Sequence, residues 1–186
     1  MSPVPKSGGS AATPPTPNAP GTLDEFMAQA WAMEMEAVQR YSDFADAMET
    51  HNNLEVAAMF RTMAQYEGKH AVQILEEMGW TEPPRLPEAN FAWPGFEAPE
   101  TASFDDVHYL MQPWHALQLA LAAEERAERF FGEIVRVATV ESVRSAAREL
   151  QAEEREHVAL VKAWIEKVVK PDPDWANDPD PARYTD

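Results

Sequence analysis

The sequence predicts an all-α protein, a four-helix bundle built from two antiparallel hairpins that a long crossover joins. Apolar residues recur at steps of three and four along four segments of the chain, which is the period of an amphipathic helix. Short connections separate the first segment from the second and the third from the fourth, whereas a Pro-rich stretch without helical period, residues 80–102, separates the two pairs. Because short connections make antiparallel neighbours, the four helices should form two hairpins.

The first helix is expected over residues 22–49. Thr22 and Glu25 have the spacing of a capping box, which marks a helix N-terminus. Glu34 occupies the missing position of the apolar stripe and should point into the core, whereas Glu36 falls on a flank and should be solvated. The stripe consists of Met27, Trp31, Val38, Tyr41, Ala45 and Met48.

The second helix should run from Leu54 to Met78, with Gly79 as its stop. Glu67 and His70 interrupt its apolar stripe. Because positions i and i+3 share one helical face, both side chains should reach the same part of the core. The apolar members of the stripe are Val56, Phe60, Met63, Ile74 and Met78.

The crossover, residues 80–102, is long enough to return the chain to the far end of the bundle. At about 3.3 Å per residue, its roughly two dozen residues can span a helix of about 27 residues, which is about 40 Å long. Pro113 should begin or kink the third helix, which continues to about Ala138. Glu124 fills a core position in this helix. Its apolar stripe contains Leu117, Leu121, Phe131, Val135 and Ala138.

The fourth helix should follow a tight turn at Thr139 and Val140 and end at Pro171. Glu154 and His157 again interrupt an apolar stripe at a spacing of three residues. The apolar members of this stripe are Val143, Ala147, Leu150, Val161, Trp164 and Val168.

Composition predicts one domain, residues 22–169, between a flexible arm at 1–21 and an acidic, Pro-rich tail at 170–186. The absence of cysteine excludes disulfides, thiolate metal sites and a thiol nucleophile. A formal net charge of −17 argues against nucleic acid and anionic membranes as partners and is compatible with cations as ligands. With neither an apolar signal-peptide region nor a run of about 18 apolar residues, we expect a cytoplasmic protein.

The chain contains one pattern twice, a core glutamate on one helix followed by Glu-x-x-His on the next. Burying four carboxylates together would cost several kcal/mol per charge without compensation. Two divalent cations would balance them, and neutral imidazoles would complete the ligand shells. We therefore expect two iron ions, with manganese as an alternative and zinc as an adventitious occupant. The predicted ligands are Glu34, Glu67, His70, Glu124, Glu154 and His157.

These residues lie in segments that resemble the rubrerythrin-type di-iron domain of the ferritin-like superfamily over residues 22–169. The matching segments are EMEAVQRYSDFA, AQYEGKHAV, ALQLALAAEERAERFF and ELQAEEREHV. The resemblance implies that Glu34 and Glu124 are terminal ligands, that Glu67 and Glu154 bridge the metals, and that His70 and His157 are the imidazole ligands.

The sequence departs from rubrerythrins in two respects. Rubrerythrins usually carry a second glutamate one turn after the helix 3 ligand, where this chain has Ala127. They also commonly carry a cysteine-ligated rubredoxin domain, which a chain without cysteine lacks. Electrons should therefore come from ferrous ions themselves or from an external electron donor.

The expected function is oxidation of bound ferrous iron by hydrogen peroxide or dioxygen, in iron or oxidative-stress handling. One alternative is an iron-binding, storage or delivery protein with little turnover, and another is a di-iron oxygenase that acts on an organic substrate. A metal-free helical interaction protein is the fourth hypothesis. The resemblance and the frequency of twofold assemblies predict a homodimer.

The remaining polar candidates are interpreted as structural. Tyr41 is interpreted as a core tyrosine with a satisfied hydroxyl, and a hydrogen bond to a ligand carboxylate is the alternative. Three glutamates are expected to be solvated charges on helix faces, with a role in iron entry or as an accessory ligand as the alternative: Glu125, Glu128 and Glu153. Three histidines have no partner at ligand spacing: His51, His108 and His115.

Overall fold

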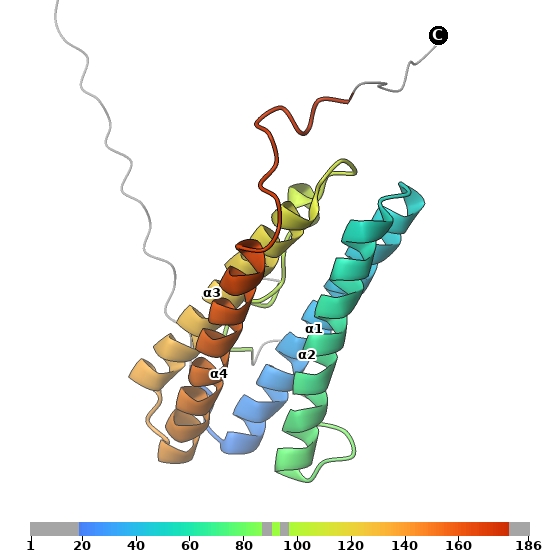
Figure 1. The fold of residues 1–186 in the computed structure, drawn as a ribbon. Helices are drawn as coiled ribbons and strands as arrows, with labels where there is room; N and C mark the ends of the chain where they lie inside the picture. The colour runs from blue at the N-terminus through green and yellow to red at the C-terminus, as the bar shows by residue number, and fades with distance from the viewer. Residues whose placement is uncertain (1–18, 87–90, 94–96, 179–186) are drawn as a thin grey trace, which may run out of the picture.

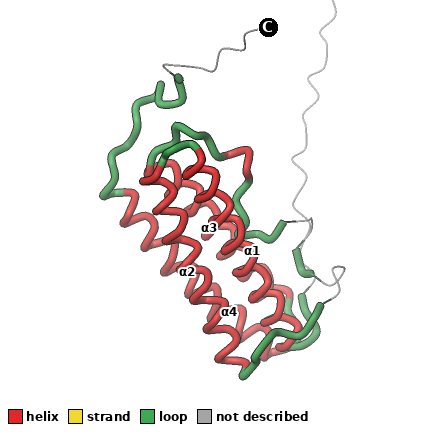
Figure 2. Tube along the Cα trace, turned by 90° about the vertical axis from the view of Figure 1, so that its right-hand side faces the viewer, coloured by secondary structure: helices red, strands yellow, loops and turns green. Residues whose placement is uncertain are grey.

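The computed structural model describes residues 19–86, 91–93 and 97–178, which form a four-helix bundle (Figure 1; Figure 2). The described residues contain no strand, which confirms the predicted fold class. A short 3₁₀ helix, η2, precedes the third long helix. The helices are α1 (Leu23–Thr50), α2 (Leu54–Met78), η2 (Phe104–Asp106), α3 (Pro113–Val137) and α4 (Glu141–Ile165).

The long helices pack as two hairpins, α1 along α2 and α3 along α4. The α1–α2 turn contains Asn52 at φ 58°, a left-handed conformation that asparagine tolerates better than most residues. The crossover leaves the C-terminal end of α2 and returns to the opposite end of the bundle, so that α3 runs parallel to α2 (Figure 1). This confirms the predicted hairpins and the long connection between them.

The helix ends follow most of the predicted stop and start signals. Thr22 Oγ1 accepts a hydrogen bond from the Glu25 amide at 3.2 Å, and the Glu25 carboxylate accepts one from the Gly21 amide at 3.0 Å. Gly79 ends α2 at φ 66°, where a left-handed residue is needed. Pro113 is the first residue of α3, so it begins this helix rather than kinking it.

The prediction that the fourth helix extends to Pro171 is wrong, because α4 ends at Ile165. After this residue the amides of Lys167 and Val168 bond to carbonyls three residues back, as in a tightened last turn. The chain beyond packs through Trp175, whose ring lies 3.8 Å from that of His115 between centroids.

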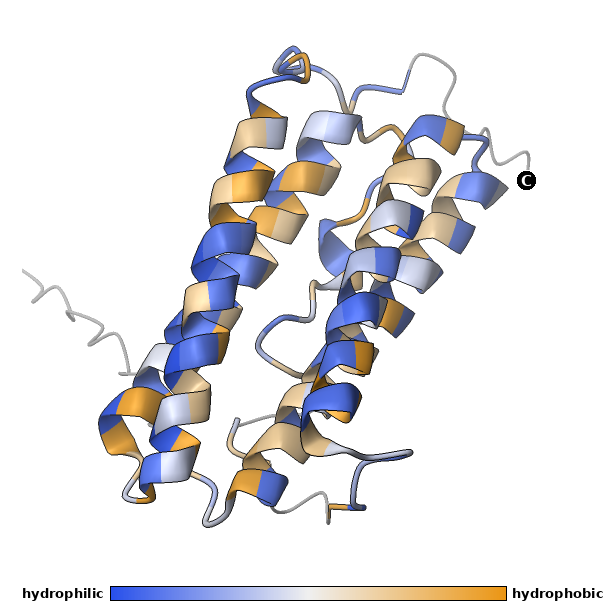
Figure 3. Ribbon diagram, turned by 60° about the horizontal axis from the view of Figure 1, so that its bottom comes forward, coloured by the Kyte–Doolittle hydropathy of each residue, from blue (hydrophilic) through white to orange (hydrophobic). Residues whose placement is uncertain are grey.

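Two apolar clusters fill the bundle, one on each side of a polar layer at mid-length. Burial of these side chains removes apolar surface from water and is the main favourable contribution to folding. The cluster nearer the α1–α2 turn includes Phe44, Met48, Phe60, Leu117 and Val161. The cluster at the other end includes Phe26, Met33, Ile74, Phe131 and Val143. In Figure 3 hydrophilic and hydrophobic residues alternate along each helix, as expected of amphipathic helices.

The last part of the crossover is fixed to the bundle by side chains of α1 and α3. Arg40 on α1 donates to the Ala102 carbonyl at 2.6 Å, and Arg126 on α3 donates to the carbonyls of Pro99 and Thr101 at 2.8 and 3.1 Å. Figure 3 shows a loop that runs between the two helix pairs. This segment therefore lies against both hairpins.

Glu36 also holds this segment, which corrects the prediction that it is simply solvated. Its carboxylate accepts hydrogen bonds from the Ala98 amide at 3.1 Å and from the Thr101 hydroxyl at 2.8 Å. The flank position that the sequence indicates is right, but the crossover covers that flank. Glu36 therefore helps to hold the crossover against α1.

Candidate metal centre

The structure brings together all six residues that the sequence analysis predicts as ligands. Each hairpin supplies one triad of two glutamates and a histidine, and the candidate ligand atoms of each triad lie within 4.8 Å of one another. The two triads are Glu34, Glu67 and His70 in the first hairpin, and Glu124, Glu154 and His157 in the second. All four glutamates are buried, and both histidines are partly buried.

The two triads have nearly the same geometry. In the first, His70 Nδ1 lies 3.3 Å from Glu67 Oε2 and 3.7 Å from Glu34 Oε2. In the second, His157 Nδ1 lies 3.3 Å from the Glu154 carboxylate and 3.4 Å from that of Glu124. The three-residue spacing on α2 and α4 places each imidazole beside its own helix's carboxylate, and the antiparallel partner helix adds the second carboxylate.

A third group joins the two triads. Carboxylate oxygens of Glu67, Glu100 and Glu124 also lie within 4.8 Å of one another. Each triad forms one half-site of the candidate metal centre, and the two half-sites meet at this point. Glu100 lies in the crossover and is only 2% exposed. The sequence does not mark Glu100 as a core residue, because the crossover has no helical period from which an inward position could be read.

Several buried oxygens of this layer make no hydrogen bond of good geometry in the described part of the chain, although three of the glutamate oxygens face an imidazole nitrogen. They are Oε2 of Glu34, Glu67, Glu100 and Glu124, and the hydroxyl of Tyr41. Buried polar atoms are normally paired, and leaving one unpaired costs about 1–3 kcal/mol. Their convergence with two imidazole nitrogens therefore fits a site for cations rather than a closed hydrogen-bond network. Carboxylates with imidazoles suit iron or manganese.

Burial changes the protonation of the carboxyl groups. Desolvation raises the pKa of Glu67 from 4.5 to about 7, although the hydrogen bond with His70 opposes this shift. Desolvation also raises the pKa of Glu34 and raises that of Glu154 and Glu100 well above 4.5. These groups therefore hold protons more tightly in the folded protein than they do in water.

The histidines also hold protons more tightly than usual. Burial by itself lowers the pKa of His70, but hydrogen bonds with Glu34 and Glu67 outweigh it and raise this pKa to about 10. In the same way, Glu124 and Glu154 raise the pKa of His157 to about 11 against the effect of burial. Metal ions that bind here must displace these protons.

Tyr41 lies in the core, as predicted, but its hydroxyl has no hydrogen-bond partner in the part of the chain that the structure describes. The prediction of a satisfied hydroxyl is therefore wrong. Burial, followed by the negative charges of Glu67 and Glu124, raises its pKa well above 10. The phenol is thus neutral and close to the carboxylate layer.

The other charged candidates have structural partners. Glu125 forms an ion pair with Lys162 at 3.1 Å, and Glu128 forms one with Arg155 at 2.8 Å. Glu153 is partly buried and accepts a long hydrogen bond from Gln73 at 3.5 Å.

Two histidines near the start of α3 also have structural roles. His108 Nδ1 accepts a hydrogen bond from the Leu110 amide at 3.1 Å, and His115 Nδ1 accepts one from the Gln112 amide at 3.0 Å. His51, in turn, caps the end of α1 through its backbone amide. Within the described residues, none of these three histidines belongs to a candidate metal-binding group.

A small cavity of about 30 Å³ lies beside the triads. Glu67, His70, Glu124 and His157 line one part of it. The remaining lining is largely apolar and comes from Met63, Tyr66, Ala120, Leu160, Val161 and Trp164. A volume of this size exceeds the roughly 10–15 Å³ that one water needs, so it can hold a molecule of two oxygen atoms.

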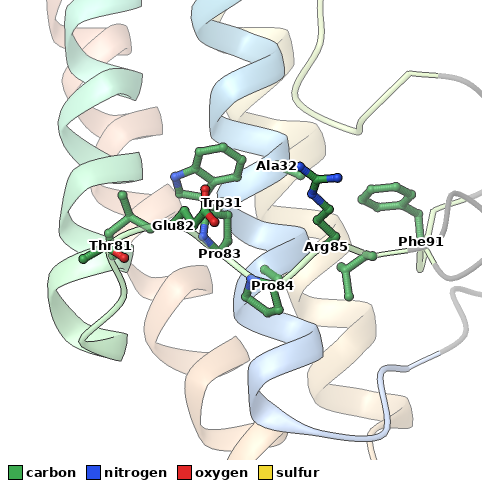
Figure 4. Close-up of a pocket in the computed structure, with 11 residues that line it drawn as sticks. Trp31, Ala32, Thr81, Glu82, Pro83, Pro84, Arg85 and Phe91 are labelled. Carbon is green, nitrogen blue, oxygen red and sulfur yellow. The ribbon is translucent and has the colours of Figure 1, made fainter.

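A larger pocket of about 360 Å³ lies between α1 and the start of the crossover. Figure 4 shows Trp31, Arg85 and Phe91 around it. None of the predicted ligands is among its lining residues within the described chain. It is therefore separate from the candidate metal centre.

A four-helix bundle with two Glu–Glu–His triads that could bind a di-iron site defines a class, the ferritin-like bundles with carboxylate metal centres. A family model described as rubrerythrin matches residues 25–107. The chain is also similar to an uncharacterized conserved protein from Magnetospirillum magnetotacticum MS-1 of known crystal structure. The identity is 38%, over 81% of this chain and 98% of that one, with a TM-score of 0.58.

The chain therefore belongs to the rubrerythrin family of the ferritin-like superfamily. Among curated proteins, none matches it. The helices that the structure describes are too short or too polar to cross a membrane.

Proposed function

We propose that this protein is a non-haem di-iron oxidoreductase that uses hydrogen peroxide or dioxygen to oxidise bound ferrous iron. The observation that carries the proposal is the convergence of four buried carboxylates and two imidazole nitrogens on one layer of the bundle. Such a layer is costly without cations, and two divalent ions balance the charge of four carboxylates. When bound, two ferrous ions supply the two electrons that reduce one peroxide molecule to water.

The residues of the chain contribute binding, orientation and exclusion of water. Each triad would hold one metal ion through its two glutamates and its histidine. The apolar clusters above and below the layer keep bulk water away, and this strengthens electrostatic interactions inside the bundle. The carboxylates, whose pKa is raised by burial, can take up and release protons as the charge of the site changes.

The cavity beside the triads favours a small oxidant over an organic substrate. Tyr66 and Leu160 line it and are partly exposed, at 37% and 40%, so it opens to the surface between α2 and α4. At about 30 Å³ it matches peroxide or dioxygen and is much smaller than the roughly 300 Å³ or more of typical sites for organic ligands. The oxygenase alternative is the weaker one for this reason.

The acidic composition supports a second candidate function in which iron is sequestered or delivered. A net charge of −17 raises the local concentration of cations around the protein. This role predicts continued uptake of ferrous ions well beyond two per chain. The proposal also includes a homodimer. Because a chain without cysteine has no thiolate-ligated iron site to supply electrons, repeated turnover would require an external electron donor.

Stopped-flow absorbance tests the proposal. Metal-free protein is loaded with two Fe²⁺ per chain without oxygen and mixed with peroxide or with dioxygen. We expect a ferric absorption to appear faster than in protein-free ferrous solution. Glu67→Ala and Glu154→Ala should remove it, whereas Glu76→Gln, at an exposed position of α2, should not. Wild-type kinetics in the Glu67→Ala and Glu154→Ala variants would contradict the assignment.

A further inference from the structure

Glu100 has the properties of a metal ligand, although it lies outside every helix. Its side chain is 2% exposed, and its Oε2 has no hydrogen-bond partner among the described residues. A carboxylate oxygen of Glu100 lies within 4.8 Å of ligand atoms of both Glu67 and Glu124. It thus reaches one carboxylate from each half-site.

The backbone that carries Glu100 is fixed on both sides. The Pro99 carbonyl, immediately before it, accepts a hydrogen bond from Arg126 at 2.8 Å. The Thr101 carbonyl, immediately after it, accepts one from the same guanidinium at 3.1 Å, and the Thr101 hydroxyl bonds to Glu36. A turn bond of 3.0 Å from the Thr101 amide to the Ala98 carbonyl tightens the segment. The carboxylate is therefore held toward the interior of the bundle.

The two arginines that hold the crossover make no described ion pair with Glu100. Arg126 uses its described bonds on backbone carbonyls, and Arg40 bonds to the Ala102 carbonyl and to the carboxylate of Glu97. Within reach of Glu100 the described chain instead presents further carboxylates. A buried acid in such surroundings has no protein partner that explains its presence, and a bound cation supplies one.

We propose that Glu100 is a seventh protein ligand of the metal centre, delivered by the crossover to the junction of the two half-sites. This inference rests on the proposed function, because it needs the di-metal site. Glu100 is absent from the lining of the small cavity, which His70 and His157 share. The two carboxylates that Glu100 approaches, Glu67 and Glu124, do line this cavity.

A fifth carboxylate gives the centre more negative charge than two divalent ions balance. By Coulomb's law, the added charge favours metal ions of higher charge, so Glu100 should stabilise the oxidised centre relative to the reduced one. The helix position three residues after Glu124 is Ala127, which is fully buried and offers no ligand. The crossover thus supplies a carboxylate that α3 does not.

Titration with Co²⁺ tests the proposal without turnover. Co²⁺ is stable in air, and its visible absorption weakens as its coordination number rises. Metal-free wild type, Glu100→Gln and the control Glu97→Gln are titrated and followed by absorbance. Glu97 lies three residues earlier in the same segment and is exposed at 54% of its side chain. We expect Glu100→Gln to weaken binding of at least one Co²⁺ by about tenfold or more and to intensify the spectrum, with Glu97→Gln unchanged.

Thermal unfolding of the same proteins separates a ligand from a packing residue. A ligand predicts that Glu100→Gln leaves the melting temperature of the metal-free protein unchanged or raises it, and reduces the increase that Co²⁺ produces. Should the Gln variant fail to fold, Glu100→Asp retains the charge with a shorter reach and should still bind more weakly. Wild-type Co²⁺ affinity and spectrum in a folded Glu100 variant would overturn the inference. Failure of the wild type to bind two Co²⁺ would instead remove the di-metal site itself.

Discussion

The imidazole rings of His70 and His157 stack on each other, with centroids 4.4 Å apart and planes 4° from parallel. The Nδ1 atom of each ring lies within 3.7 Å of the carboxylates of its own hairpin. The two rings thus meet at the interface of the hairpins, and each belongs to one half-site.

Replacing one of these histidines should weaken one metal-binding event more than the other. We expect His70→Ala and His157→Ala each to weaken one of two Mn²⁺ binding steps by about tenfold or more, because each imidazole serves its own triad. Isothermal titration calorimetry of the metal-free protein measures both steps. His115→Ala, whose ring caps α3, is the control for loss of an imidazole. Loss of both steps from either single replacement would show that the histidines do not divide between two positions.

Glu67→Gln should weaken metal binding much more than it weakens the metal-free protein. Without metal, the Glu67 carboxylate lies 3.3 Å from His70 Nδ1 and raises the pKa of His70, so its loss should lower that pKa and cost about 1–3 kcal/mol of stability. The same change removes a ligand and should abolish most of the stabilisation that metal provides. Chemical denaturation with and without Mn²⁺ measures both effects, with Glu76→Gln as the exposed control on α2. Metal-induced stabilisation of wild-type size in the variant would show that Glu67 is not a ligand.

The metal-free protein should lose stability as the pH rises from about 4.5 to about 10. The pKa of Glu67 is raised from 4.5 to about 7 and that of His70 from 6.5 to about 10, so the folded state binds more protons than the unfolded state across this window. Metal binding displaces these protons, so its stabilising effect should grow with pH over the same range. Calorimetric melting temperatures at about pH 6 and pH 8, with and without Mn²⁺, measure the two trends. A metal-induced increase that shrinks with pH contradicts this account.

Gly68→Ala should stabilise the protein by about 0.5–1 kcal/mol, because glycine in a helix interior is less favourable than alanine. The nearest atom to an added Cβ is Val38 Cγ2 at 3.9 Å, an ordinary contact distance, so no close approach requires glycine here. Gly79→Ala is a useful contrast, because its φ of 66° strains any side chain and the change should destabilise. Denaturant unfolding of the two variants gives the comparison. A destabilised Gly68→Ala variant would indicate that α1 and α2 cannot separate to admit a methyl group.

The helices and six of the candidate ligands could be predicted because periodic spacing reports them directly. An inward-facing glutamate in an apolar stripe, such as Glu34 or Glu124, is visible from its register alone. The pairing of two Glu-x-x-His motifs then indicates a shared site, since three-residue spacing fixes which side chains lie together.

The features that could not be predicted depend on irregular backbone. Glu100 reaches the centre because Arg126 and Glu36 fix the crossover, and no periodic signal encodes these contacts. The solvated role predicted for Glu36 fails for the same reason. The unpaired hydroxyl of Tyr41 depends on which atoms of neighbouring helices reach it, which spacing along one helix does not report.

The central claim is that the bundle binds two metal ions through its two triads. Anaerobic calorimetric titration of the metal-free protein with Fe²⁺ tests it most directly, beside a double variant, Glu67→Ala with Glu154→Ala. The account predicts two Fe²⁺ per wild-type chain and no tight binding by the double variant, with helical content retained by circular dichroism. Binding of no Fe²⁺ by the wild type, or undiminished binding by the double variant, would contradict it.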